Sequence, residues 1–364
     1  MASSNLNPFG SDFLQSRMGQ TDAPIRRHTL GDLLHRSAKR FPKKTAIICG
    51  QTAWTYATFD ALCDRLAAGL AARGVAKGVR VAILSRNSHA FAALRFALAR
   101  LGAVLVPINF MLKVEEVAFI LRHAGAEILA TDSEFADLAN SASGLNTNVR
   151  DFVWLPSEGN STPSTGMISF DELSSTFAEP PQVELSGSDL LQIVYTSGTE
   201  AQPKGAMLTH DAIIWQYVSC VVDASISAED LTLHALPLYH CAQLDVFLGP
   251  AIYVGGTNVI TAKPTPESLL PLIQRHCITS FFAPPTVWIS LLRSPLLKPR
   301  ICRALERATT ALLLCPLRSC AKWPNECRAY GCGIFMDKLR SHRSPPCLVR
   351  RINYGSPDLA GAQL

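Results

Sequence analysis

Long uninterrupted apolar runs are missing from this sequence of 364 residues. The best candidate, Ala97–Phe110, is broken by Arg100 and is shorter than the roughly 20 residues that a membrane-spanning helix needs. The start, Met1–Gln20, has no basic stretch followed by an apolar one, so it predicts no secretory signal. Both absences predict a cytoplasmic protein without a transmembrane segment.

Paired cysteines of the C-x-x-C type are also absent, although the chain has 11 cysteines. Zinc sites in short motifs usually depend on such pairs, so the sequence predicts no metal site built from protein side chains. In a reducing cytoplasm we expect these thiols to be free. Six of them fall near the end of the chain, at Cys302, Cys315, Cys320, Cys327, Cys332 and Cys347.

A strong charge excess is absent from most of the chain. Residues 298–364 contain 12 Lys/Arg and 4 Asp/Glu, whereas residues 1–297 contain 22 and 25. The near-neutral body excludes an electrostatic case for nucleic-acid binding. The basic end can make peripheral contact with an anionic membrane surface, although such a run is more often a solvated face.

What the sequence does contain is a strand–helix alternation, which begins at Thr29 after a polar leader, residues 1–27. Thr55 is placed to begin a helix and Gly74 to end it. Alternation of short apolar strands with helices predicts an α/β fold with mostly parallel sheets covered by helices. The predicted strands are Val79–Leu84, Ala103–Ile108, Glu127–Thr131, Leu190–Tyr195, Leu231–Leu236, Thr257–Thr261 and Ile278–Phe282. The other predicted helices are His89–Leu101, Lys113–Ala124, Thr209–Val222, Cys241–Tyr253, Pro266–His276 and Pro285–Leu292.

One strand leads directly into Thr196-Ser-Gly-Thr-Glu-Ala-Gln-Pro-Lys-Gly205, with a helix expected after it. The residue types suit a triphosphate. Gly198 and Gly205 permit close backbone approach, and Lys204 supplies a compact cation. Thr196, Ser197 and Thr199 supply hydroxyl donors, and successive N–H groups in such a turn form an anion-binding concavity. The alternative is an ordinary polar turn, which the length and order of the pattern disfavour.

This ten-residue pattern resembles the signature of the AMP-binding, adenylate-forming superfamily, which includes acyl-CoA synthetases. It is not a Walker A loop, because Lys204 is followed by Gly205 and Ala206 rather than by Ser or Thr. Glu200-Ala201 stands where the family usually has Thr-Gly. The resemblance runs from about Thr29 to Pro295 and includes Gly102-Ala-Val-Leu-Val-Pro-Ile-Asn109, Pro237-Leu-Tyr-His240 and Ala283-Pro-Pro-Thr286.

The resemblance implies the family's large N-terminal domain and its reaction. A carboxylic acid, on this reading a fatty acid, is joined to ATP as an acyl-adenylate and then transferred to CoA, with Mg²⁺ assisting. It assigns the phosphates to Thr196, Ser197, Gly198, Thr199, Lys204 and Gly205, with Lys204 also catalytic. It places His240 beside the acyl carboxylate. The alternative for His240 is a hydrogen-bonded core histidine. For Asn109, which ends one of the matching stretches, the alternative to a role in the site is an ordinary turn residue.

After Leu297 the alternation fades, and the family's later motifs and small C-terminal domain are absent from residues 298–364. Reading synonymous codons of this tail from the third base can restore a family-like Tyr-Gly-Gln-Thr-Glu. Some letters are forced: Met336 followed by Asp337 can yield only glycine. We therefore expect an out-of-frame, poorly ordered tail, which sequencing codons 290–310 would test.

Three functional hypotheses follow. The domain at 28–297 is an incomplete acyl-CoA ligase with impaired turnover, a binding module that holds ATP or an acyl ligand without turnover, or an adenylation domain that loads a carrier protein. Impairment is expected because lost contacts remove transition-state stabilisation. Exchange of pyrophosphate into ATP, measured with a panel of acids, separates these hypotheses.

Overall fold

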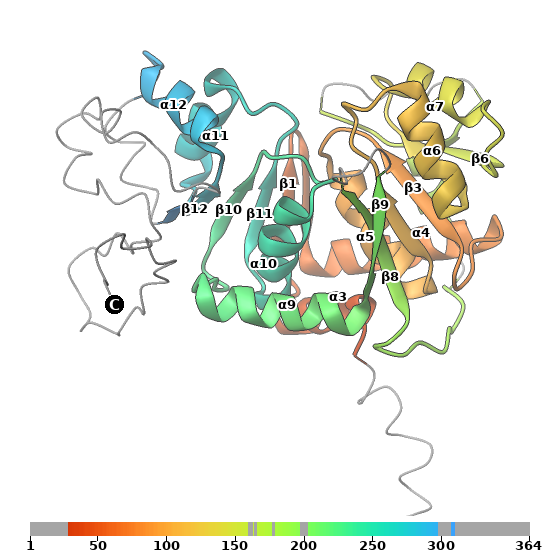
Figure 1. The fold of residues 1–364 in the computed structure, drawn as a ribbon. Coiled ribbons are helices and arrows are strands. Elements are labelled where there is room, and N and C mark those ends of the chain that lie inside the picture. Colours follow the sequence, from red (N-terminus) through yellow and green to blue (C-terminus); the bar gives the residue numbers. More distant parts are fainter. Residues whose placement is uncertain are drawn as a thin grey trace, which may run out of the picture.

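Two β-sheets lie side by side in the computed structural model, which describes residues 28–158, 163, 166–176, 179–196, 203–297 and 307–309. The six-stranded sheet has the order β13-β12-β10-β11-β1-β2, and the seven-stranded sheet has the order β7-β6-β5-β3-β4-β8-β9 (Figure 1). Every described pairing is parallel except β1 with β2 and β8 with β9. The predicted mostly parallel α/β class is therefore confirmed.

The strands of the first sheet are β1 (Thr45–Cys49), β2 (Thr52–Thr55), β10 (Leu231–His234), β11 (Thr257–Ile260), β12 (Ser280–Phe282) and β13 (Arg307–Thr309). Those of the second are β3 (Arg80–Leu84), β4 (Val104–Pro107), β5 (Ala126–Thr131), β6 (Asp151–Trp154), β7 (Ile168–Ser169), β8 (Leu190–Thr196) and β9 (Lys204–Thr209). The helices are α3 (Leu30–Arg40), α4 (Tyr56–Ala72), α5 (His89–Leu101), α6 (Val114–Ala124), α7 (Ala136–Ser143), α8 (Phe170–Ser174), α9 (His210–Asp223), the π-helix η1 (Ala242–Leu248), α10 (Gly249–Val254), α11 (Pro266–His276) and α12 (Pro285–Arg293).

The helix boundaries follow local signals that the sequence contains. The Thr55 hydroxyl accepts a hydrogen bond from the Thr58 N–H and begins α4, as predicted. Gly74 has a φ of +79° just after this helix, in the left-handed region that glycine adopts without strain. The bounds of α5 and α11 are those predicted, whereas the predicted helix from Cys241 begins as a π-helix.

The division of the strands between the two sheets is set by the tertiary structure, because alternation alone does not say which strands pair. One prediction needs correction. The helix expected directly after the polar loop is preceded by β9, which pairs antiparallel with β8, so the loop closes a hairpin. The strand was missed because its burial is low and irregular, and its partner provides its hydrogen bonds. The predicted leader and nearly all of the predicted tail lie outside the described residues.

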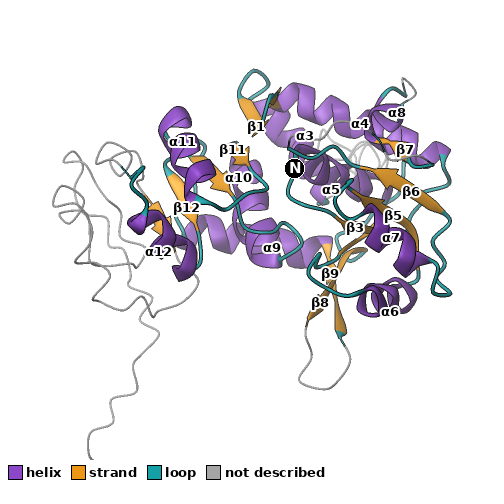
Figure 2. Cartoon of the chain, turned by 90° about the horizontal axis from the view of Figure 1, so that it is seen from above, coloured by secondary structure: helices purple, strands orange, loops and turns teal. Residues whose placement is uncertain are grey.

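Helices and sheets alternate in layers in the order helix, sheet, helix, sheet, helix (Figure 2). Three hydrophobic clusters hold these layers together. The two faces of β3 show why. Val81 and Ile83 point into the cluster that holds α3, α4 and α5 between the sheets, whereas Ala82 and Leu84 point to α6 and α7. On the first sheet, Phe281 and its neighbours pack against α11 and α12. This alternation is the period of two that strand geometry imposes.

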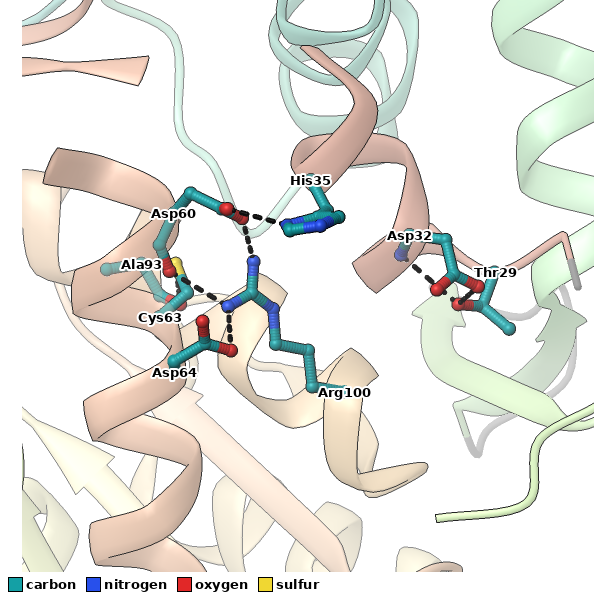
Figure 3. Close-up of polar contacts among 8 residues, drawn as sticks. All are labelled: Thr29, Asp32, His35, Asp60, Cys63, Asp64, Ala93 and Arg100. Atoms are coloured by element: carbon teal, nitrogen blue, oxygen red, sulfur yellow. Dashed lines mark hydrogen bonds and ion pairs between the residues drawn. The ribbon is translucent and has the colours of Figure 1, made fainter. Parts of the chain in front are cut away.

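Polar contacts also join the central helices. The guanidinium of Arg100, on α5, forms ion pairs with Asp60 and Asp64 on α4 (Figure 3). Asp60 also lies 2.8 Å from Nδ1 of His35 on α3. Because the Arg100 and Asp60 side chains are only 11% and 12% exposed, each needs the other to offset its loss of water. The three helices are thereby held in one layer.

Candidate active site

The β8–β9 hairpin brings together part of the predicted phosphate-binding set. Thr196 and Lys204 are the last pair of the hairpin before the connecting loop, and both are exposed. The next pair is Tyr195 with Gly205. Ser197, Gly198 and Thr199 lie outside the described residues, so their assignment stays a prediction. The pairing places a residue with a hydroxyl opposite a residue with an ammonium group on the two strands.

Gly205 has a packing role that the sequence did not suggest. A Cβ atom added there would lie 2.9 Å from Cγ2 of Ile193 and 3.1 Å from Cζ of Tyr195. The Tyr195 ring therefore occupies the space beside the glycine. Its hydroxyl lies 2.7 Å from Nδ1 of His123, which joins the hairpin to α6. Burial raises the pKa of the Tyr195 phenol, so it stays protonated at neutral pH.

Asn87 holds the second predicted segment, Pro237–His240, from both sides. Its Nδ2 donates to the Leu236 carbonyl at 2.7 Å and to the Thr261 carbonyl at 3.1 Å. Its Oδ1 accepts from the Leu238 N–H at 2.7 Å. Asn87 follows β3, whereas Leu236 and Thr261 follow β10 and β11. The carboxyl ends of strands from both sheets therefore meet at this side chain, the place where α/β folds commonly bind ligands.

An aromatic cluster continues this edge toward the hairpin. Tyr239 packs edge-on against Phe110 at 4.9 Å between ring centroids, and Phe110 stacks on Phe135 at 5.2 Å. The Arg86 guanidinium lies 4.3 Å above the Phe110 ring. Phe110 follows β4, which neighbours β8 in the sheet. The 237–240 segment and the hairpin strand are thus linked through adjacent strands.

His240 is exposed at the end of this segment. Its Nδ1 accepts a hydrogen bond from the Ala242 N–H at 3.1 Å. The neutral ring therefore carries its proton on Nε2, which makes that atom a donor. The exposed position excludes the alternative of a core histidine. Asn109, by contrast, is a turn residue, because its Oδ1 accepts from the Met111 N–H at 2.9 Å.

Cys241 does not form an activated thiol with this histidine. Its Sγ lies 3.9 Å from Nδ1 of His240. Burial, and to a smaller extent the charge of Asp245, raises the pKa of the thiol. A neutral thiol is a weak nucleophile. The geometry and the raised pKa therefore give no support to covalent catalysis by this cysteine.

His234, a buried histidine that the sequence analysis missed, contacts Gln243, which in turn accepts a hydrogen bond from the Leu236 N–H just before the 237–240 segment. His234, on β10, lies between Gln243 of η1 at 2.7 Å and Asn258 of β11 at 2.9 Å. The Gln243 carbonyl oxygen accepts from the Leu236 N–H, so the amide donates to Nδ1 of His234. Burial lowers the pKa of His234 to about 4. No local signal marks these residues, because their contacts form only in the folded chain.

Two searches of the described residues bear on binding. They contain no helix with both the length and the apolarity required to cross a bilayer. They also contain no group of three or more His, Cys, Asp or Glu side chains arranged to hold a metal ion.

Comparison with known proteins gives consistent matches. A family model described as AMP-binding enzyme matches residues 34–322. Feruloyl-CoA synthase of Amycolatopsis is 33% identical over 272 residues, which cover 74% of this chain and 52% of that protein. Long-chain-fatty-acid–CoA ligase FadD13 of Mycobacterium tuberculosis is 34% identical over 228 residues, 61% of this chain and 43% of that protein. The inhibitor-bound N-terminal domain of FACL13 from Mycobacterium tuberculosis has a TM-score of 0.69 at 29% identity, covering 78% of this chain and 69% of that one. The chain spans about half the length of the curated relatives it matches.

Proposed function

Because the chain belongs to the AMP-binding enzyme family, we propose that it activates a carboxylic acid with ATP as the first half of an acid–CoA ligase reaction. The observation that carries the proposal is the proximity of the two predicted motifs. Tyr239 of the 237–240 segment packs against Phe110, which follows β4. β4 neighbours β8, the first strand of the hairpin that presents Thr196 and Lys204.

The first step is a substitution at phosphorus. A carboxylate oxygen attacks the α-phosphorus of ATP, the bond to the β-phosphate bridging oxygen breaks, and pyrophosphate leaves with that electron pair. Thr196, Ser197, Gly198, Thr199, Lys204 and Gly205 are proposed to hold the phosphates. Lys204 offsets negative charge as pyrophosphate departs. His240 is proposed to donate its Nε2 proton to the carboxylate and orient it, which the Ala242 N–H bond to Nδ1 supports because it leaves the proton of the neutral ring on Nε2.

The second step belongs to the proposal for the complete ligase. The CoA thiol loses its proton to solvent and attacks the carbonyl carbon of the acyl-adenylate, the bond from that carbon to the phosphate oxygen breaks, and AMP leaves with the electron pair. Mg²⁺ characteristically binds through substrate phosphates, waters and one or two carboxylates rather than through a dedicated protein cage. We therefore propose that it arrives with ATP, and that the chain's own residues hold the phosphates around it.

The substrate proposal is a fatty acid, with an aromatic acid as the second candidate. The relative from Mycobacterium tuberculosis is a long-chain-fatty-acid–CoA ligase, and the relative from Amycolatopsis is a feruloyl-CoA synthase. The proposed site of action is the cytoplasm, with peripheral membrane contact through the basic end.

Exchange of labelled pyrophosphate into ATP tests the first step. The full chain should support exchange with dodecanoate or ferulate. Lys204→Ala and His240→Ala should each lower the rate at least tenfold, since each removes a group that acts on developing charge or on orientation. Lys43→Ala, at an exposed lysine, and His276→Ala, at the end of α11, are matched controls that should change it less than twofold.

Each other outcome selects a different reading. ATP binding without exchange would favour the non-catalytic binding module. Exchange with amino acids alone would favour an adenylation domain that loads a carrier protein. If the chain neither binds ATP nor supports exchange, the proposal is refuted.

A further inference from the structure

A buried polar cluster connects the two halves of the proposed site. Arg95, on α5, is 1% exposed, and its Nη1 donates to Oε1 of Gln192 on β8 at 2.5 Å. Its Nη2 donates to Oδ1 of Asp245 on η1 at 2.5 Å and to the Tyr217 hydroxyl on α9 at 3.1 Å. The Gln192 amide donates to the other Asp245 oxygen at 2.7 Å. We call Arg95, Gln192 and Asp245 the anchor triad.

Burying the anchor triad costs desolvation free energy, and its contribution to stability does not by itself account for its presence. Asp245 is 1% exposed and Gln192 is fully buried, so three polar groups have lost their water in the largest apolar cluster. Replacing a buried ion pair with apolar groups of similar volume is often neutral or stabilising. Stability alone therefore does not explain the arrangement. Its geometry gives another reason.

Gln192 is the residue at which the hairpin strand joins its sheet. Among the described residues, β8 is paired with β4 at a single register position, Leu105 with Gln192. Beyond that position β8 pairs with β9 as far as Thr196 and Lys204. Gln192 is therefore the position at which a side chain on β8 can fix the base of the hairpin relative to the rest of the molecule. The Gln192 amide provides that attachment at the register position itself.

Asp245 supplies the connection to the other half. It lies in η1, the π-helix that begins two residues after His240. π-Helical turns are rare and occur frequently at functional sites. Because one carboxylate accepts from both Arg95 and Gln192, the base of the hairpin and the helix that follows His240 cannot shift independently.

We propose that Arg95, Gln192 and Asp245 are positioning residues that fix the hairpin relative to the His240 segment, so that the carboxylate and the α-phosphate meet in line. This inference rests on the proposed function. None of the three residues touches the substrates. Their effect is therefore on the geometry of the reacting groups rather than on the contacts that bind each ligand. Small displacements of reacting groups can lower a rate by about 100-fold.

The test compares two variants that each remove one partner of Arg95. Gln192→Met keeps the side-chain volume and the Arg95–Asp245 pair but removes the amide that ties the base of the hairpin to both of them. Tyr217→Phe removes a buried partner of the same guanidinium on α9, which carries no proposed site residue. Both should lower the melting temperature. Gln192→Met alone should lower the kcat of pyrophosphate exchange at least tenfold, with KM for ATP and for dodecanoate changed less than threefold.

Moving the carboxylate from position 245 to position 192 tests whether the exchange rate can be rescued. Asp245→Asn leaves Arg95 buried without its counter-ion and is expected to fold poorly. Adding Gln192→Glu returns a carboxylate to the triad and should restore most of the exchange rate. If Gln192→Met and Tyr217→Phe change kcat equally, or neither changes it, while the wild-type chain is active, the inference is wrong and the proposed function stands. An inactive wild-type chain that does not bind ATP would overturn both.

Discussion

Asn87 gives the sharpest test of how the site is built, because one side chain holds the carboxyl ends of three strands. Asn87→Ala removes two donated bonds and one accepted bond in a site where the residue is only 4% exposed. The Leu238 N–H loses its partner, and because Leu238 is only 1% exposed, water does not readily replace that partner. Leaving such a donor unpaired costs about 1–3 kcal/mol, and each lost bond to a carbonyl costs about 0.5–1.5 kcal/mol.

The sum is about 2–6 kcal/mol, which is a large part of the 5–15 kcal/mol typical of a domain. The assay is urea unfolding followed by tryptophan fluorescence, with the free energy of unfolding extrapolated to water. Asn140→Ala, at an exposed position on α7, is the matched control and should change stability by no more than about 0.5 kcal/mol. A loss below about 1 kcal/mol for Asn87→Ala would refute the reasoning, because it would mean that water or relaxation replaces all three bonds.

Asn87→Asp refines the same test. The carboxylate can still accept from the Leu238 N–H, but its other oxygen would face the Leu236 and Thr261 carbonyls. At neutral pH this variant should be at least as unstable as Asn87→Ala. Relative to wild type it should recover as the pH falls, because only the protonated carboxyl can donate to a carbonyl. The folded state then binds the proton more tightly than the unfolded state does.

The remaining predictions concern the hairpin and the response to pH. Gly205→Ala would push a methyl group against Ile193 and Tyr195 and should cost about 1–3 kcal/mol and weaken ATP binding, whereas Gly144→Ala should be close to neutral; equal effects in the unfolding and ATP-binding assays would contradict the contact argument. Burial lowers the pKa of His234 to about 4, from 6.5 when it is unperturbed, so between these values the unfolded state binds more protons. Stability should therefore fall from pH 6.5 toward pH 4, by up to about 1.4 kcal/mol per pH unit for this group. His234→Gln should flatten that slope in urea titrations at pH 7, 6 and 5, and an unchanged slope would exclude His234 as its source.

Local sequence predicted much of this fold because local interactions decide it. Ser88 caps α5 through the Phe91 N–H, and Gly102 at φ +64° ends the helix, so its bounds are readable without the rest of the chain. The family resemblance is likewise carried by contiguous stretches, and the predicted N-terminal-domain fold is confirmed. The assignments of individual site residues and the boundaries at 27 and 297 stay predictions.

What the sequence by itself determined is therefore most of the main strands and helices, the α/β class, the family and the positions of the two motifs. Only the tertiary structure decided that the strands form two sheets, that β8 and β9 pair on either side of the predicted phosphate motif, and that Asn87 joins the sheets at the His240 segment. The physical reason is separation along the chain: the three bonds of Asn87 connect residues 149, 151 and 174 positions apart. Such contacts depend on how layers pack, and no periodicity or local motif encodes them.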